Sequence, residues 1–234
     1  MATYVLIHGA SDAFYWHRVI PLLQSRGHEV VAPDLPIDDD GAGFADYADT
    51  VVRAMTEAVG HPTDLVVVGQ SMGAFTAPII CQRLQVELLV LVAPMIPAPG
   101  ETLGAWWDNT GQSQAEREFA EREGRDPDAA FDVMTTFLHD VPQDTIEAVL
   151  QHGVPGQSET IFAQPWPMDA WPAVPTRVLI GRDDRLLPAD LLRRVAVERL
   201  GITPDETPGG HLLAFGHPDA VVDWLESYRS EVVG

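Results

Sequence analysis

The sequence predicts an α/β fold, in which a mainly parallel sheet of about six strands is flanked by helices and carries an inserted helical cap. Two observations predict the sheet: short apolar runs alternate with segments of helical period, and the runs are apolar throughout instead of alternating with polar residues. Uninterrupted apolar runs are typical of parallel strands buried on both faces. A third observation predicts the cap, because the alternation stops between about residues 94 and 172.

The first part of the chain alternates strands with helices. The strands are expected at residues 3–8, 29–35, 64–69 and 87–94, and the helices at residues 14–27, 44–59 and 71–84. Phe44, Tyr47 and Val51 fall on one face of the second helix, which is the pattern of a helix packed on a core. The first helix is expected to end at Gly27, since glycine is favoured directly after a helix.

The segment between about residues 94 and 172 has no strand signal but contains helical patterns. These patterns cover residues 112–123, 131–141 and 144–152. A stretch of about 80 residues is too long for a loop without structure, so we expect a helical cap within a single domain of residues 1–234. The alternation then resumes with strands at 176–181 and 203–208 and helices at 189–200 and 219–229.

The composition excludes several classes of function. A formal net charge of −21 argues against nucleic acids and anionic membranes as partners, because both would be repelled by this surface. All 14 basic residues are arginine, which excludes lysine-dependent Schiff-base chemistry and P-loop phosphate binding. The single cysteine, Cys81, excludes an internal disulfide and a cysteine-based metal cluster.

Targeting and cofactor motifs are also missing from the sequence. No apolar run is long enough to span a membrane, and the start MATYVLIHG lacks the charged leader of a signal peptide, so we expect a cytoplasmic protein. There is no HExxH motif, and residues 41–46 lack the third glycine of a dinucleotide fingerprint, so no metal and no cofactor is expected. The sequence leaves open whether the protein is a monomer or a homodimer.

A Gly-x-Ser-x-Gly motif, GQSMG at residues 69–73, lies between a predicted strand and a predicted helix. A chain that turns sharply at Ser71 needs small residues at Gly69 and Gly73, and the turn raises the serine hydroxyl at the N-terminus of the helix. That position suits a nucleophile. The pentapeptide alone fits an ordinary turn with a capping serine equally well, so other residues have to decide.

Candidates for an acid and a base that would activate this serine lie farther along the chain. In parallel sheets such groups come from loops at the carboxyl ends of strands, in the chain order serine, acid, histidine. Asp183 and Asp184 follow the fifth predicted strand, and His211 lies in a glycine-rich loop after the sixth. His217 competes for the role of base, but it directly precedes Pro218, a residue type favoured at helix starts.

Together these motifs resemble the α/β-hydrolase fold family over the whole chain. The first third is similar to the plant-type methylesterase and hydroxynitrile lyase branch, with an HGA loop at residues 8–10 and the strand segment RGHEVVAPDL at residues 26–35. The segments GQSMG, GRDDRLLP and GGH extend the similarity into the second half. The resemblance implies a sheet that begins at the third strand of the full fold, and hence about six strands.

The resemblance also implies roles for single residues. Enzymes of the family place the acid three residues after a glycine and before a proline, which selects Asp184 and leaves Asp183 as a solvated neighbour. His211 is then the base. The oxyanion hole is expected from two backbone N–H groups, that of Met72 directly after the nucleophile and that of Ala10 in the first loop.

Residues for substrate binding are expected in the cap and beside the catalytic groups. In the cap these are the large apolar residues Trp106, Trp107, Met134 and Phe137, which a small core of the cap would explain equally well. Beside the catalytic groups they are Gly9 and Leu212, where the resembling hydroxynitrile lyases carry threonine and lysine. Without the lysine charge there is no group to stabilise departing cyanide, which favours ester hydrolysis.

The sequence therefore predicts a cofactor-free serine hydrolase that cleaves a carboxylic ester or lactone of a small, largely apolar substrate through an acyl-enzyme. Two alternatives stay open. One is a lyase or another non-hydrolytic enzyme on the same scaffold, and the other is a ligand-binding protein of hydrolase ancestry.

Overall fold

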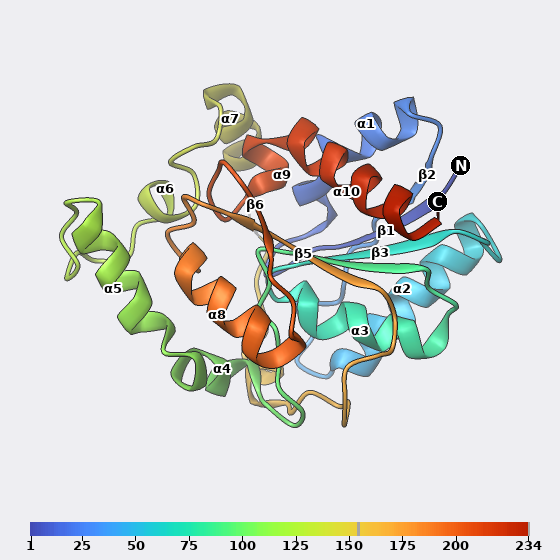
Figure 1. Cartoon of the computed structure of the whole chain (residues 1–234), viewed down its shortest axis with the longest axis horizontal. Coiled ribbons are helices and arrows are strands. Elements are labelled where there is room, and N and C mark those ends of the chain that lie inside the picture. Colours follow the sequence, from blue (N-terminus) through green and yellow to red (C-terminus); the bar gives the residue numbers. More distant parts are fainter. Residues whose placement is uncertain (154, 234) are drawn as a thin grey trace.

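The computed structural model describes residues 1–153 and 155–233. Among these residues, six parallel strands form one sheet in the order β2-β1-β3-β4-β5-β6 (Figure 1). The strands are β1 (Thr3–Ile7), β2 (Glu29–Val31), β3 (Leu65–Gln70), β4 (Leu88–Val92), β5 (Thr176–Gly181) and β6 (Asp205–Thr207). The predicted α/β fold with a parallel sheet is confirmed.

Helices cover both faces of the sheet (Figure 1). One face carries α1 (Val19–Ser25) and α10 (Pro218–Val233), and the other carries α2 (Phe44–Ala58), α3 (Gly73–Arg83) and α8 (Ala189–Leu200). The short helices η1 (Ala13–Trp16) and α9 (Leu213–Gly216) precede α1 and α10. The single helix predicted over residues 14–27 is therefore wrong, because Pro21 has no N–H to continue a helix that begins at residue 14 and fits only the first turn of α1.

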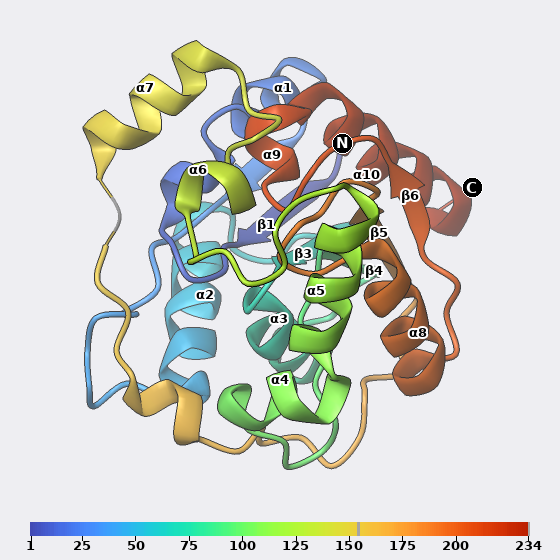
Figure 2. The same cartoon turned by 90° about the vertical axis from the view of Figure 1, so that its left-hand side faces the viewer.

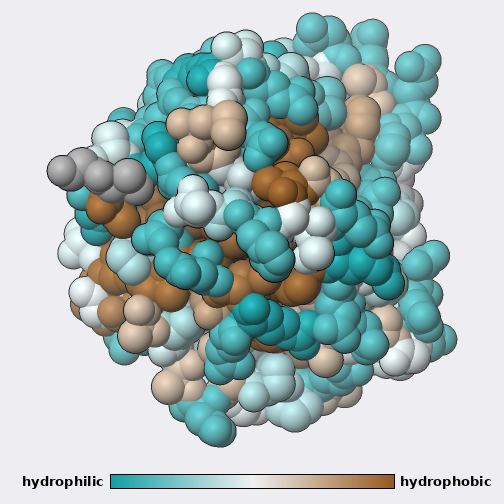
Figure 3. All heavy atoms as spheres, turned by 90° about the vertical axis from the view of Figure 1, so that its right-hand side faces the viewer, coloured by the Kyte–Doolittle hydropathy of each residue, from teal (hydrophilic) through white to brown (hydrophobic). Residues whose placement is uncertain are grey.

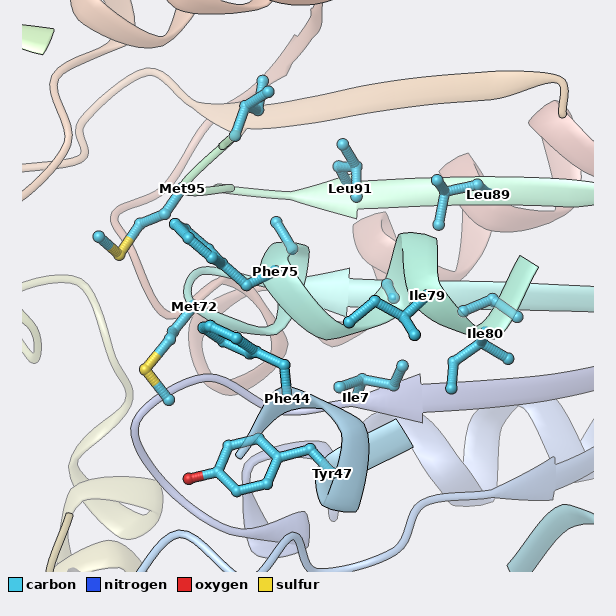
Figure 4. Packing of buried hydrophobic residues seen from close by; sticks show 14 of the residues in the cluster. Ile7, Phe44, Tyr47, Met72, Phe75, Ile79, Ile80, Leu89, Leu91 and Met95 are labelled. Atoms are coloured by element: carbon cyan, nitrogen blue, oxygen red, sulfur yellow. The ribbon is translucent and has the colours of Figure 1, made fainter. Parts of the chain in front are cut away.

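Alternate side chains of the strands enter two separate cores. In β1, Ile7 packs with residues of α2, α3 and α8, whereas Leu6 packs with residues of α1 and α10, and both are fully buried. Figure 4 shows part of the first core, where the rings of Phe44 and Phe75 stack with centroids 5.4 Å apart and join α2 to α3. Because both faces are covered, the strands need apolar side chains at every position, which explains their uninterrupted apolar sequences.

The chain between β4 and β5 forms helices on the side of the carboxyl ends of the strands (Figure 2). They are α4 (Leu103–Thr110), α5 (Gln112–Arg122), α6 (Val133–Thr136) and α7 (Gln143–His152), followed by η2 (Thr160–Ala163). The helices α5 and α7 agree with two predicted helical segments, and α4 is an additional helix. We refer to the segment from α4 to η2 as the cap.

The helix predicted over residues 131–141 is wrong in extent, since only the single turn of α6 forms. After α6 the side chains of Leu138 and Val141 are buried in the second core, and Asp140 accepts a hydrogen bond from the backbone N–H of Gly210. These contacts with the main body of the protein override the local helical pattern.

The side of the molecule away from the cap is shown in Figure 3, where hydrophilic residues border a band of hydrophobic ones. In the part of the chain that the structure describes, no helix combines the length and the apolar character that a membrane crossing requires. The predicted catalytic residues follow the carboxyl ends of β3, β5 and β6, so they lie on the cap side.

A buried ion pair connects the beginning of the cap to α8. The side chain of Glu101 is 3% exposed and accepts hydrogen bonds from Asn109 at 2.8 Å and from Arg199 at 2.9 Å. Burial alone would raise the pKa of Glu101, but the hydrogen bonds from Arg199 and Asn109 outweigh it, and the pKa is lowered.

We expect Glu101→Ala to lower the free energy of unfolding by about 3 kcal/mol, because the partly buried guanidinium of Arg199 is left without its carboxylate partner. Since the folded-state pKa of Glu101 lies below its ordinary value of 4.5, the pair stabilises the fold fully above that pH, and the contribution is lost as the pH falls through the lowered pKa. Urea unfolding of both proteins at neutral and acidic pH measures this difference. The control is Glu198→Ala, which removes an exposed carboxylate of α8; equal losses in the two variants would contradict the expectation.

Candidate active site

Ser71 lies between β3 and α3 with a left-handed backbone angle φ of 50°, which is rare for a residue that carries a side chain. Two backbone hydrogen bonds at the end of β4 hold it: Ser71 N–H donates to Val92 O at 3.0 Å, and Met95 N–H donates to Ser71 O at 3.0 Å. The chain therefore leaves the sheet abruptly at this serine, and its hydroxyl is presented at the start of α3.

The two glycines of the GQSMG motif are required by space. A Cβ atom at Gly69 would lie 2.8 Å from Ala77 Cβ, and one at Gly73 would lie 2.8 Å from the carbonyl oxygens of Ile7 and His8. Real Cβ atoms do not approach other atoms so closely. Without a side chain, Gly73 lets α3 pack against the end of β1, which brings the serine next to the loop that follows β1.

Ser71, His211 and Asp184 form a hydrogen-bonded chain. The Nε2 atom of His211 lies 3.0 Å from Ser71 Oγ, and its Nδ1 atom lies 2.8 Å from Asp184 Oδ2. The second carboxylate oxygen, Oδ1, accepts hydrogen bonds from the backbone N–H groups of Leu186 and Leu187. With an ionised Asp184 accepting the Nδ1 proton, His211 Nε2 is the acceptor for the serine hydroxyl. All three side chains are buried.

The two competing residues have different partners. Asp183 is exposed, and its Oδ2 accepts a hydrogen bond from the backbone N–H of Gly209 at 3.0 Å instead of meeting the imidazole of His211. His217 ends α9 and pairs through Nε2 with Asp140 Oδ2 at 3.4 Å. The geometry therefore places Asp184 and His211, and neither Asp183 nor His217, next to Ser71.

Ala10 and Met72 line the same cavity as Ser71. No described residue accepts a hydrogen bond from either backbone N–H, so both donors are free, and that of Met72 lies at the N-terminus of α3 where the helix dipole favours an anion. Gly9 lies behind them and does not line the cavity. A Cβ there would lie 2.8 Å from Gln70 Oε1 and 3.0 Å from Ser71 Cβ, so glycine allows the first loop to approach the serine.

His8 is buried behind this loop and does not contact the serine hydroxyl. Its Nδ1 lies 2.9 Å from Gly9 O, and its Nε2 accepts a hydrogen bond from Leu35 N–H at 3.1 Å. Nδ1 must therefore carry the proton, and the ring is neutral. Burial lowers the pKa of His8, which fits a residue that fixes the loop.

A cavity of about 410 Å³ opens beside the serine and is lined mainly by apolar side chains. Its aromatic lining comes from Phe14, Tyr15, Trp107, Phe131, Phe137, Phe162 and Phe215. Among the predicted substrate-binding residues, Trp107, Phe137 and Leu212 line the cavity.

Two predicted substrate-binding residues of the cap lie elsewhere. Trp106 is fully buried in the core, where its indole N–H donates to Ile96 O at 2.9 Å. Met134 is 43% exposed at the surface of α6 and does not line the cavity. The neighbouring indoles of Trp106 and Trp107 are nearly perpendicular, with an interplanar angle of 88°, and of the two only Trp107 lines the cavity.

Gln70 and Tyr15 line the cavity but were not among the predicted site residues. The amide Nε2 of Gln70 lies 3.4 Å from His211 Nε2, and the hydroxyl of Tyr15 accepts a hydrogen bond from Ala214 N–H at 3.2 Å. Burial raises the pKa of Tyr15 well above its usual range, so the phenol is neutral. The position of Gln70 directly before Ser71 could have identified it from the sequence as a residue of the site. Nothing in the sequence marks Tyr15 or Phe215 as residues that line the cavity.

The described residues contain no group of three or more His, Cys, Asp or Glu side chains placed to hold a metal ion. The carboxylates of Asp183 and Asp184 are engaged with backbone N–H groups and with the imidazole of His211.

Comparison with known proteins identifies relatives of this architecture. Norfluorocurarine synthase 1 of a Strychnos species is 30% identical over 103 residues, which cover 40% of this chain and 39% of the relative. Polyneuridine aldehyde esterase of Rauvolfia serpentina is 27% identical over 110 residues, 43% of this chain and 41% of the relative. The matches thus span about two fifths of the curated relatives' length.

Solved structures match over nearly the whole chain. A crystal structure of polyneuridine aldehyde esterase superposes with a TM-score of 0.76 at 17% identity, covering 97% of this chain and 98% of the other. A pyrethroid hydrolase from Sphingobium faniae JZ-2 gives a TM-score of 0.73 at 22% identity, covering 98% and 97%. These likenesses support the fold. The model of the alpha/beta hydrolase family matches residues 4–224, and the chain therefore belongs to the alpha/beta hydrolase family.

Proposed function

We propose that this protein is a serine hydrolase that cleaves a carboxylic ester or lactone without a cofactor. The observation that carries the proposal is the buried chain from Ser71 Oγ through the imidazole of His211 to Asp184, with distances of 3.0 and 2.8 Å. Nucleophile, base and orienting acid are within hydrogen-bonding reach of one another, as nucleophilic catalysis requires. Esterases among the relatives are consistent with this class of reaction.

In the first step, Ser71 Oγ attacks the carbonyl carbon of the ester while its proton moves to His211 Nε2. The carbonyl oxygen becomes an oxyanion, for which the free N–H groups of Ala10 and Met72 are the proposed donors. Each such donor is typically worth about 3 kcal/mol in the transition state. When the tetrahedral intermediate collapses, the C–O bond to the alcohol breaks and the alcohol leaves with the proton of His211.

In the second step, water gives a proton to His211 Nε2 and attacks the carbon of the acyl-enzyme. The new intermediate collapses by breaking the bond to Ser71 Oγ, which takes the proton back, and the carboxylic acid is released. Throughout, Asp184 keeps the imidazole in one orientation and stabilises its protonated form, while two backbone N–H groups hold the carboxylate itself.

The size and the lining of the cavity favour a small, uncharged and largely apolar substrate. Its volume of about 410 Å³ is within the ordinary range for small-molecule sites. Among the described residues that line it there is no arginine, and the carboxylate of Asp12 is paired with His152 at 2.7 Å. A substrate carrying its own carboxylate would find no arginine to bind in this lining, whereas a neutral ester can bury its apolar part against the aromatic walls.

The alternative is a non-hydrolytic reaction on the same scaffold. It is favoured by one observation, that a relative at 30% identity is named a synthase and not an esterase. Gly9 and Leu212 argue against the cyanohydrin-cleaving type, because neither residue offers a charge to a leaving anion. The partly buried thiol of Cys81 is no rival nucleophile, since desolvation raises its pKa to about 12.

We expect Ser71→Ala to lower the rate of ester hydrolysis by about a millionfold while the fold stays intact, because the nucleophile is lost. Side-by-side assays with short aryl or methyl esters and with mandelonitrile measure both reactions, with circular dichroism as the check on folding. The wild type should cleave the esters and release negligible cyanide. Cyanide release without esterase activity, or a variant that keeps more than a few per cent of the ester hydrolysis, would contradict the proposal.

We expect Asp184→Asn to lower kcat by about 10⁴-fold, because an amide no longer selects the histidine tautomer whose Nε2 accepts the serine proton. The matched control is Asp183→Asn, one residue earlier, which keeps an acceptor for Gly209 N–H and should change kcat by less than about tenfold. Steady-state kinetics of the two variants decide between the carboxylates, and the reverse ranking would assign the acid to Asp183.

A further inference from the structure

Two carboxylates hold the loop that carries the catalytic histidine. The backbone N–H of Gly209 donates to Asp183 Oδ2 at 3.0 Å, and that of Gly210 donates to Asp140 Oδ2 at 2.6 Å. Asp183 belongs to the loop after β5, but Asp140 comes from the cap, between α6 and α7. The cap thus reaches the backbone N–H of Gly210, the residue directly before His211. Hydrogen bonds from backbone N–H to a carboxylate are shorter and stronger than those between neutral groups.

The glycines before the histidine make this approach possible. A Cβ atom at Gly210 would lie 2.8 Å from His139 Cε1 and 2.9 Å from Asp140 Oδ1, so a larger residue would force these two cap side chains to shift. Gly209 has a φ of +123°, a conformation that side chains rarely adopt, and its Cβ would lie 2.4 Å from His217 Cδ2. The second glycine of the GGH segment is therefore explained by contact with the cap and not by backbone conformation.

Two histidines lie close to the carboxylate of Asp140. Its side chain is 16% exposed, with His217 Nε2 at 3.4 Å from Oδ2 and His139 Nε2 at 4.0 Å from Oδ1. The Oδ1 atom and both ring nitrogens of His139 are buried without a hydrogen-bond partner among the described residues.

We propose that Asp140 is a positioning residue, which acts through Gly210 to fix the imidazole of His211 between Ser71 and Asp184. The proposal rests on the proposed function, because it assigns Asp140 to the base of that reaction. Moving a catalytic group by about 1 Å can lower a rate about 100-fold, so a hydrogen bond to the residue directly before His211 is expected to have a measurable effect.

Three variants separate positioning from anchoring. Asp140→Ala removes the acceptor, and Asp140→Asn keeps an acceptor for Gly210 N–H but no charge. Asp144→Ala removes an exposed carboxylate of α7 whose hydrogen-bond partner among the described residues is Thr145. We expect kcat to fall about 100-fold in Asp140→Ala with KM changed less than about threefold, whereas Asp140→Asn keeps most of kcat and Asp144→Ala all of it.

The outcome that overturns the proposal is a fall in kcat that is equal in Asp140→Ala and Asp144→Ala, or a change confined to KM. A proton NMR signal from His211 Nδ1–H provides a readout without substrate. It should be present in the wild type, Asp140→Asn and Asp144→Ala, and lost or broadened in Asp140→Ala.

The same signal distinguishes the two proposals. If the wild type hydrolyses no ester but the signal still depends on the acceptor at residue 140, the proposed function fails and the positioning role stands. If the wild type is an esterase and the signal is unchanged in Asp140→Ala, the positioning role fails alone. Where Asp140→Ala does not fold, the Asp140→Asn protein decides: loss of the signal in that folded variant contradicts a role carried by the hydrogen-bond acceptor.

Discussion

The left-handed conformation of Ser71 is the constraint on which the site depends. Holding a residue other than glycine in the left-handed region of backbone angles costs about 1–3 kcal/mol of folding free energy, and contacts elsewhere in the structure have to offset this cost. It does so with the two hydrogen bonds to the end of β4 and with the glycines on either side, whose missing side chains let α3 pack against β1 and β3. If β4 ended elsewhere or α3 lay farther from β1, the hydroxyl would not be held at the start of the helix.

A close approach between two backbone segments also determines the position of His211. A Cβ at Gly181, the last residue of β5, would lie 2.3 Å from Gly209 O and 2.5 Å from Gly210 O, so the histidine loop lies directly against the end of that strand. Asp184 lies three residues after Gly181, which puts its carboxylate within hydrogen-bonding reach of the His211 imidazole. The arrangement of Ser71, His211 and Asp184 therefore depends on two places where backbones approach so closely that only glycine fits. One is beside Ser71, and the other is at Gly181. The cap adds a third contact through Asp140.

Much of the fold and of the catalytic core can be predicted from the sequence because these features are encoded locally. Apolar runs define the strands, and the glycines at 69, 73 and 209 mark positions where a side chain cannot fit. The cap is less predictable, since its short helices depend on contacts with the main body. A sequence does not show that Trp106 turns into the core while Trp107 faces the cavity, nor that Asp140 meets Gly210, which is 70 residues away.

The most direct test of the account is irreversible labelling with a fluorophosphonate, which reacts with an activated serine. The account predicts one adduct per chain on the peptide that contains Ser71, formed in proportion to the loss of esterase activity, and no adduct in the Ser71→Ala protein. Mass spectrometry of the intact chain and of its peptides measures both stoichiometry and position. An unlabelled protein that is fully active, or an adduct on any other residue that accompanies inactivation, would contradict Ser71 as the nucleophile.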